Sequence, residues 1–157
     1  MTSAWQQLSS NQRSEPELLL AYAGQLQLLG AQEEAEELLR KTLKQVYDSR
    51  LIRLYGLLRG RDPARQLQTA EGLLKQHPQD AQLLLSLGRL CLQNNLWGKA
   101  REYFEISLDF SRSAETCAEL ARLLAHLGEL EKSNQLFQEG LGLLDQQLPS
   151  LPLPARA

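Results

Sequence analysis

The sequence contains few of the residues that usually carry chemistry. It has two cysteines, two histidines and one methionine among 157 residues. Cys91 and Cys117 are too few for a disulfide framework, and both fall at apolar helical positions, so we expect buried free thiols in a reducing compartment. The chain also has no Gly-rich phosphate loop, no Cys-x-x-Cys and no His-Glu-x-x-His. The sequence therefore predicts neither an enzyme nor a cofactor or metal site.

Long apolar runs and an excess of basic charge are also missing. The longest runs, such as Leu83 to Leu85, are far below the roughly 18 residues that span a bilayer. The first thirteen residues lack the basic and apolar regions of a signal peptide. A formal charge of −2 and a pI near 5.7 give no basic field to attract nucleic acid. We expect a soluble fragment without a nucleic-acid partner.

The residues that are abundant favour helices. Leu, Gln, Glu and Ala dominate, while aromatic residues make up 6%. Between residues 84 and 104, apolar and small residues stand at relative positions 0, 3, 4, 7, 16 and 20: Leu84, Leu87, Gly88, Cys91, Ala100 and Phe104. This pattern is typical of the helix-turn-helix unit of a tetratricopeptide repeat, in which small residues let two antiparallel helices approach. Such a unit buries its apolar face only against further copies.

The same pattern recurs along the chain. The small residues of the first helices are separated by 33, 32 and 33 residues: Ala23, Gly56, Gly88 and Ala121. The small residues of the second helices follow 12 positions later: Ala35, Ala100 and Ser133. In the second unit this register slips, and Gln66 or Leu67 takes the place. Gly30, Asn95 and Gly128 lie at turns that need a left-handed backbone. We predict an all-α, right-handed solenoid of about four tetratricopeptide-like antiparallel helix pairs.

The predicted domain boundaries follow from helix caps and breakers. One repeat domain is expected over residues 1–147, with repeats near 15–47, 48–79, 80–112 and 113–147 after a short helix over 3–11. Helix starts are predicted from Ser14 with Glu17, from Asp62 with Pro63, and from Asp48, Asp80 and Ser113. The proline-rich residues 148–157 are expected to form a disordered or extended tail.

The candidate binding residues are basic side chains on the first helices. Arg89 and Arg122 directly follow Gly88 and Ala121, while Arg50, Arg53 and His126 lie on corresponding helices. Because guanidinium groups bind carboxylates bidentately, these residues predict a groove for an acidic peptide or a carboxylate ligand. The alternative is that Arg89 and Arg122 only pair with neighbours such as Glu119.

Other polar residues are expected to be structural. His77 is predicted to be a solvated turn residue, and His126, Cys91 and Cys117 match no zinc spacing. The carboxylates of Glu33, Glu34, Glu36 and Glu37 are predicted to be solvated on the outer face of one helix.

Several segments resemble the C-terminal repeat region of HemY-type proteins, which are bacterial haem-biogenesis proteins. The segments are Leu51 to Leu58, Leu74 to Pro78 and Leu87 to Tyr103, with Trp5, Pro16 to Ala23 and Ala35 to Arg40 in the same order. The most specific is Leu96 to Glu102, because generic repeats rarely combine Trp97 with Gly98. The resemblance covers residues 3 to 145.

The resemblance implies a non-catalytic scaffold whose protein partners are haem-pathway enzymes. It also implies a parent protein anchored in the bacterial inner membrane through an N-terminal region absent from this chain. Two alternatives remain open: porphyrin or haem held by Arg89 and Arg122 through its propionates, and a generic adaptor of another envelope or secretion assembly. Because no capping helix is predicted after the last pair, self-association is a further expectation.

Overall fold

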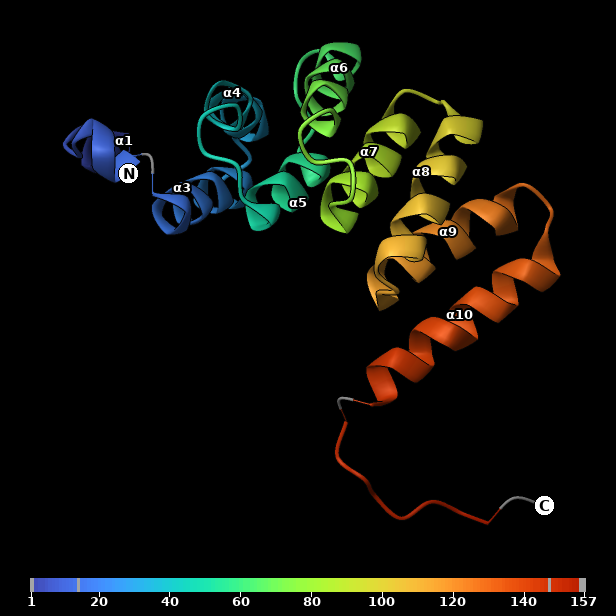
Figure 1. Ribbon diagram of the computed structural model, residues 1–157. Helices are drawn as coiled ribbons and strands as arrows, with labels where there is room; N and C mark the ends of the chain where they lie inside the picture. The colour runs from blue at the N-terminus through green and yellow to red at the C-terminus, as the bar shows by residue number, and fades with distance from the viewer. Residues whose placement is uncertain (1, 14, 147, 156–157) are drawn as a thin grey trace. The chain divides into compact units, whose positions relative to one another are not determined.

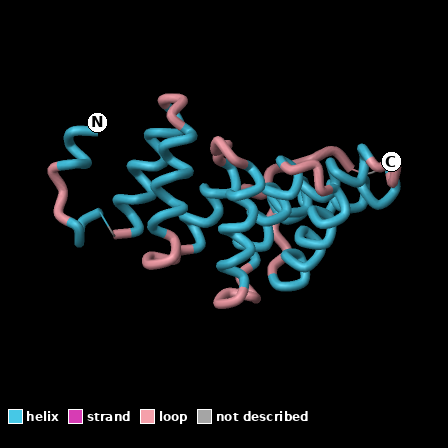
Figure 2. Tube along the Cα trace, turned by 90° about the horizontal axis from the view of Figure 1, so that it is seen from above, coloured by secondary structure: helices cyan, strands magenta, loops and turns pink. Residues whose placement is uncertain are grey.

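The computed structural model describes residues 2–13, 15–146 and 148–155, and all regular elements in these ranges are helices (Figure 1). They are α1 (Thr2–Gln6), α2 (Ser10–Arg13), α3 (Pro16–Leu28), α4 (Gln32–Thr42), α5 (Ser49–Leu57), α6 (Pro63–Leu74), α7 (Ala81–Gln93), α8 (Trp97–Phe110), α9 (Ala114–His126) and α10 (Leu130–Asp145). Short turns connect most of them, and Figure 2 shows no strand in the described part of the chain. The all-α prediction is confirmed.

The chain divides into two compact units, Met1–Ser111 and Arg112–Ala157. In the first unit α3 packs against α4 and α7 against α8, while α5 packs against both α3 and α7. In Figure 1 the first helices α3, α5 and α7 of this unit lie on one side, and α4 and α6 lie on the other. The second unit contains the pair α9 and α10. The expectation of one continuous domain over residues 1–147 stays a prediction.

The small residues stand where helices approach closely, as their spacing predicts. Gly56 is buried, and a Cβ built on it would lie 2.7 Å from the Cβ of Ser86 on α7. A Cβ on Gly88 would overlap the ring of Phe104 on α8, which is itself fully buried. In the second unit Ala121 is fully buried, and the Ser133 hydroxyl donates to its carbonyl at 2.6 Å. Period and close packing therefore coincide.

Gln66 resolves the slipped register of the second repeat. Its side chain is buried and its Nε2 donates to the carbonyls of Tyr55 and Leu58 at 3.0 and 2.9 Å. Its Oε1 accepts from the backbone N–H of Gly60 at 3.1 Å. Gln66 thus provides hydrogen-bond partners for the backbone groups that are left unpaired at the end of α5. A smaller side chain would be too short to reach them. It is the equivalent of Ala35, Ala100 and Ser133.

The predicted caps and turns are present where the structure describes them. The side chains of Asp48, Asp62, Asp80 and Ser113 each accept a backbone N–H in the first turn of the following helix. Gly30, Asn95 and Gly128 have φ values of 81°, 59° and 86°. Ser14 lies outside the described residues, and Glu15 occupies the N-cap position of α3. Residues 148–155 form neither helix nor strand.

Two predicted helices differ in extent from the structure. The helix expected over 3–11 is wrong, because the chain breaks into α1 and α2. Ser9 and Gln12 cap each other reciprocally, with Ser9 N–H donating to Gln12 Oε1 at 2.9 Å and Gln12 N–H to Ser9 Oγ at 3.2 Å, which starts a new helix. The second helix of the first repeat ends at Thr42 rather than near Val46.

Candidate functional site

The candidate arginines are distributed over both units. Arg50 and Arg53 lie on α5 and Arg89 on α7, so packing of these helices brings three of the predicted residues onto neighbouring elements. Arg53 is exposed and Arg89 is half-buried. Arg122 and His126 are both exposed on α9 of the second unit. The predicted partner-binding role of all five residues stays a prediction.

Arg50 links two consecutive repeats. Its Nε lies 3.1 Å from Asp48 Oδ1, and its Nη2 lies 3.4 Å from Glu17 Oε1 on α3. The hydrogen bond from the Arg50 side chain to Asp48 lowers the pKa of that carboxyl and raises the pKa of the guanidinium. Since the Arg50 side chain is half exposed in both pairs, they contribute little to stability. Arg50 therefore has structural partners of its own.

Arg122 pairs with Glu119 one turn earlier on α9. Glu119 is buried while Arg122 is exposed, so the guanidinium covers a carboxylate at the edge of the core. The pairing with this neighbour is therefore present, while the alternative that Arg122 serves only this pairing stays a prediction.

The two cysteines are fully buried free thiols, as predicted. Burial raises the pKa of each to about 11, so neither is a thiolate near neutral pH. Cys117 Sγ donates to Glu139 Oε2 at 3.5 Å, and hydrogen bonds from Arg112 lower the pKa of Glu139. Among the described residues, no group of three or more His, Cys, Asp or Glu side chains could hold a metal ion.

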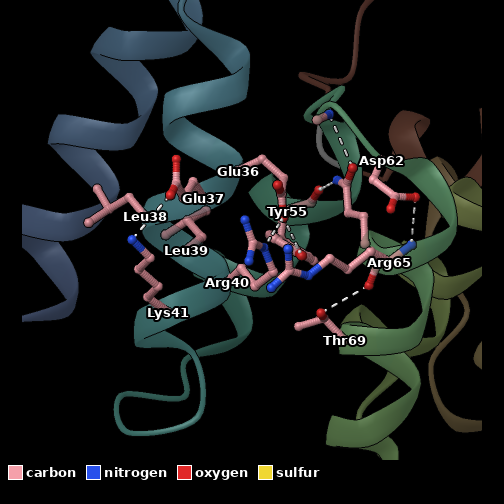
Figure 3. Close-up of polar contacts among 12 residues, drawn as sticks. Glu36, Glu37, Leu38, Leu39, Arg40, Lys41, Tyr55, Asp62, Arg65 and Thr69 are labelled. Atoms are coloured by element: carbon pink, nitrogen blue, oxygen red, sulfur yellow. Dashed lines mark hydrogen bonds and ion pairs between the residues drawn. The ribbon is translucent and has the colours of Figure 1, made fainter.

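A buried polar cluster occupies the inner side of α4. Glu36 is only 6% exposed, so the prediction that its carboxylate is solvated is wrong. Its Oε2 accepts from the Tyr55 hydroxyl at 2.7 Å and from Arg40 Nε at 3.1 Å (Figure 3). Burial, followed by the hydrogen bond to Glu36, raises the pKa of Tyr55. A Cβ on Gly60 would lie 2.7 Å from Glu36 Cγ, so the close backbone of this turn covers the carboxylate.

A basic cleft lies beside this cluster, between α4 and α6. We call it the α4/α6 cleft; its volume is about 490 Å³ and it is lined by Arg40, Lys41, Lys44, Arg65, Gln68 and Thr69. In Figure 3 the Arg65 side chain extends from α6 towards α4, and its guanidinium lies beside that of Arg40. The sequence prediction missed this site, because its residues come from the second helices α4 and α6 and the turn after α4, whereas the predicted binding residues all lie on first helices.

Other polar and apolar surface residues have simpler surroundings. His77 is half-buried and stacks on Tyr47, with ring centroids 3.6 Å apart, so it is more enclosed than the predicted solvated turn residue. In the first turn of α8 Trp97 is 46% exposed, and a Cβ on Gly98 would meet no atom within 4 Å. No helix in the described part of the chain is long and apolar enough to cross a membrane.

Known structures share this fold at low sequence identity. MamA residues 41 to the end from Desulfovibrio magneticus RS-1 aligns with a TM-score of 0.64 and 19% identity, over 86% of this chain and 78% of that one. A crystal structure of MamA gives 0.64 and 13% identity, over 92% and 87%. Tetratricopeptide repeat protein 21B from Mus musculus is 29% identical over 80 residues, which is 51% of this chain and 6% of that protein. No family model matches the sequence.

This chain has a tetratricopeptide-like helical repeat fold. The period, the buried small residues and the shared fold all agree on this point. Tetratricopeptide-like folds typically mediate protein–protein interaction, and their repeats generally act as non-catalytic scaffolds. In the first unit the packing of the repeats leaves uncovered the first-helix side, with Arg53 and Arg89, and the second-helix side, with the α4/α6 cleft.

Proposed function

We propose that the chain is a non-catalytic scaffold that binds enzymes of haem synthesis through the first-helix side of its repeats. The observation that carries the binding surface is the placement of Arg53 and Arg89 on the neighbouring helices α5 and α7. Neither arginine occupies one of the small or apolar positions that form the core of the repeat. Guanidinium groups on adjacent helices suit a partner segment that carries carboxylates.

The proposal of the haem pathway rests on a resemblance to HemY-type proteins, which two segments carry: residues 51–58 and residues 87–103. Trp97 and Gly98 are the most specific part of that resemblance. Packing within the repeat explains neither residue, since Trp97 is half-exposed and Gly98 borders open space. An exposed tryptophan supplies a large contact area to a partner. We propose that Trp97 contributes to the same scaffold function.

The proposal is tested by binding of this chain to purified enzymes of the late haem pathway. We expect saturable binding by surface plasmon resonance to at least one of them, weakened about tenfold or more by Arg53→Glu with Arg89→Glu. Arg61→Glu is the matched control, because Arg61 is exposed on the turn after α5 and pairs with Glu33. Failure of every enzyme to bind would remove the haem assignment, and unchanged binding by the double variant would remove the surface.

Haem itself provides the contrasting experiment. A scaffold that recognises proteins gives no saturable change in the Soret band when haem is titrated into the chain. A saturable shift that Arg89→Glu abolishes would replace the scaffold proposal with direct porphyrin binding.

A further inference from the structure

At the junction between α6 and α8, polar side chains of two neighbouring second helices bind one another. Glu71 on α6 accepts a hydrogen bond from Lys99 Nζ at 3.0 Å and from the Tyr103 hydroxyl at 2.9 Å, both on α8. Burial and the bond to Glu71 raise the pKa of Tyr103. One carboxylate thus satisfies a cation and a hydroxyl on the next second helix.

The α4/α6 cleft occupies the equivalent junction one repeat earlier. Counting from the equivalent residues Ala35, Gln66 and Ala100, the position of Glu71 is taken by Arg40. The positions of Lys99 and Tyr103 are taken by Arg65 and Thr69. A cation and a hydroxyl are therefore kept on the second side of the junction, while the carboxylate on the first side is replaced by another cation.

The charges lining this cleft are only partly compensated. Arg40 pairs with the buried Glu36, and Lys41 pairs with the exposed Glu37, each at 3.1 Å. Neither Lys44 nor Arg65 forms an ion pair with any other side chain in the part of the chain that the structure describes. Four cations against two carboxylates leave two positive charges in a cleft of about 490 Å³.

We propose that the α4/α6 cleft binds carboxylate side chains from an acidic segment of a partner protein. The neighbouring junction indicates the chemistry, because there a glutamate satisfies the residues equivalent to Arg65 and Thr69. An incoming glutamate contacts the Arg65 guanidinium beside Thr69, whose hydroxyl donates to the Arg65 carbonyl at 3.0 Å, and a second glutamate contacts Lys44. The Arg40 guanidinium, held through its Nε by Glu36, keeps its remaining N–H groups for the ligand. This surface lies on the second-helix side of the first unit, opposite the surface proposed for the scaffold function.

The direct test is fluorescence anisotropy of a labelled hexaglutamate peptide with the full chain at low ionic strength. We expect saturable binding that weakens with added salt, and none by a hexaglutamine peptide. Lys44→Glu and Arg65→Glu should each weaken binding about tenfold or more, since each variant places a carboxylate in the cleft. Circular dichroism checks that both variants keep the helical fold.

Lys75→Glu is the matched control. Lys75 lies at the position equivalent to Lys44 in the α6/α8 junction, where Glu71 already provides the carboxylate. We expect this variant to bind hexaglutamate within about twofold of the parent chain. The proposal is overturned if hexaglutamate does not bind, if Lys75→Glu weakens binding as much as Lys44→Glu, or if inorganic phosphate competes for the site while carboxylates do not. None of these outcomes affects binding at Arg53 and Arg89, so the two proposals fail separately.

Discussion

The α4/α6 and α6/α8 junctions are built from equivalent repeat positions but differ in charge. In the α6/α8 junction Glu71 binds Lys99 and Tyr103, so the negative charge of Glu71 compensates the positive charge of Lys99. In the α4/α6 junction Arg40 and Arg65 lie beside each other, and the carboxylate of Glu36 is buried beneath them. Each junction is formed by two consecutive second helices of the repeats. The two junctions therefore share one repeat pattern, and we propose that single charged positions on the second helices decide which junction binds a partner.

The largest expected effect distinguishes the two carboxylates by burial. Glu36→Ala removes the partner of Tyr55 and Arg40 and should lower the free energy of unfolding by about 2 to 3 kcal/mol, because it leaves a buried hydroxyl unsatisfied. Glu71→Ala, at a half-exposed junction, should lower it by less than about 1 kcal/mol. Urea unfolding followed by circular dichroism at neutral pH measures both. Equal losses would contradict the difference in burial.

A charge exchange should convert one junction into the other. Glu71→Arg places a guanidinium beside Lys99 and Tyr103, which reproduces the arrangement of Arg40, Arg65 and Thr69. We expect this variant to bind a second hexaglutamate with an affinity within about tenfold of the first site. Isothermal titration calorimetry gives the stoichiometry. A stoichiometry that stays at one would mean that equivalent position and charge are insufficient to create the site.

Removal of one tyrosine hydroxyl from each junction should lower the free energy of unfolding by different amounts. Tyr55→Phe removes a hydrogen bond to a buried carboxylate and should cost about 1.5 kcal/mol of stability. Tyr103→Phe removes the bond to Glu71, which Lys99 still contacts, and should cost about 0.5 kcal/mol. Thermal unfolding of the two variants gives the comparison. A larger loss for Tyr103→Phe would reverse the assignment of the buried cluster.

The smallest expected effects differ in sign. Arg65→Ala relieves repulsion from Arg40 and should leave stability unchanged or raise it by up to about 0.5 kcal/mol. Lys99→Ala removes an attractive pair and should lower stability by about 0.5 kcal/mol. Unfolding at low and high salt tests this, because salt should reduce both differences. Destabilisation of the same size by both substitutions would show that the cleft cations do not repel each other.

The repeat architecture could be predicted from the sequence because it depends on local period. Ala23, Gly56, Gly88 and Ala121 recur at nearly constant spacing, and their burial follows directly from helix packing. The turns at Gly30, Asn95 and Gly128 follow from backbone sterics in the same way. These features need no knowledge of which side chains meet across repeats.

The second-helix cleft could not be predicted in the same way. Glu36 shares a run of glutamates with solvated neighbours, and its burial depends on Tyr55 and on the close turn at Gly60. Arg40 and Arg65 meet only once Gln66 fixes the register of the second repeat. The sequence alone leaves that register open between Gln66 and Leu67, so it does not show that Arg40 is equivalent to Glu71.

The most direct test of the difference between the junctions is an ¹H–¹⁵N correlation spectrum of the full chain titrated with hexaglutamate. We expect shifts of the backbone amides of residues 40, 41, 44, 65, 68 and 69, which line the cleft. The amides of Glu71, Lys99 and Tyr103 should stay in place, because that junction already holds its carboxylate. Shifts concentrated at Arg53 and Arg89, or equal shifts at both junctions, would contradict this expectation.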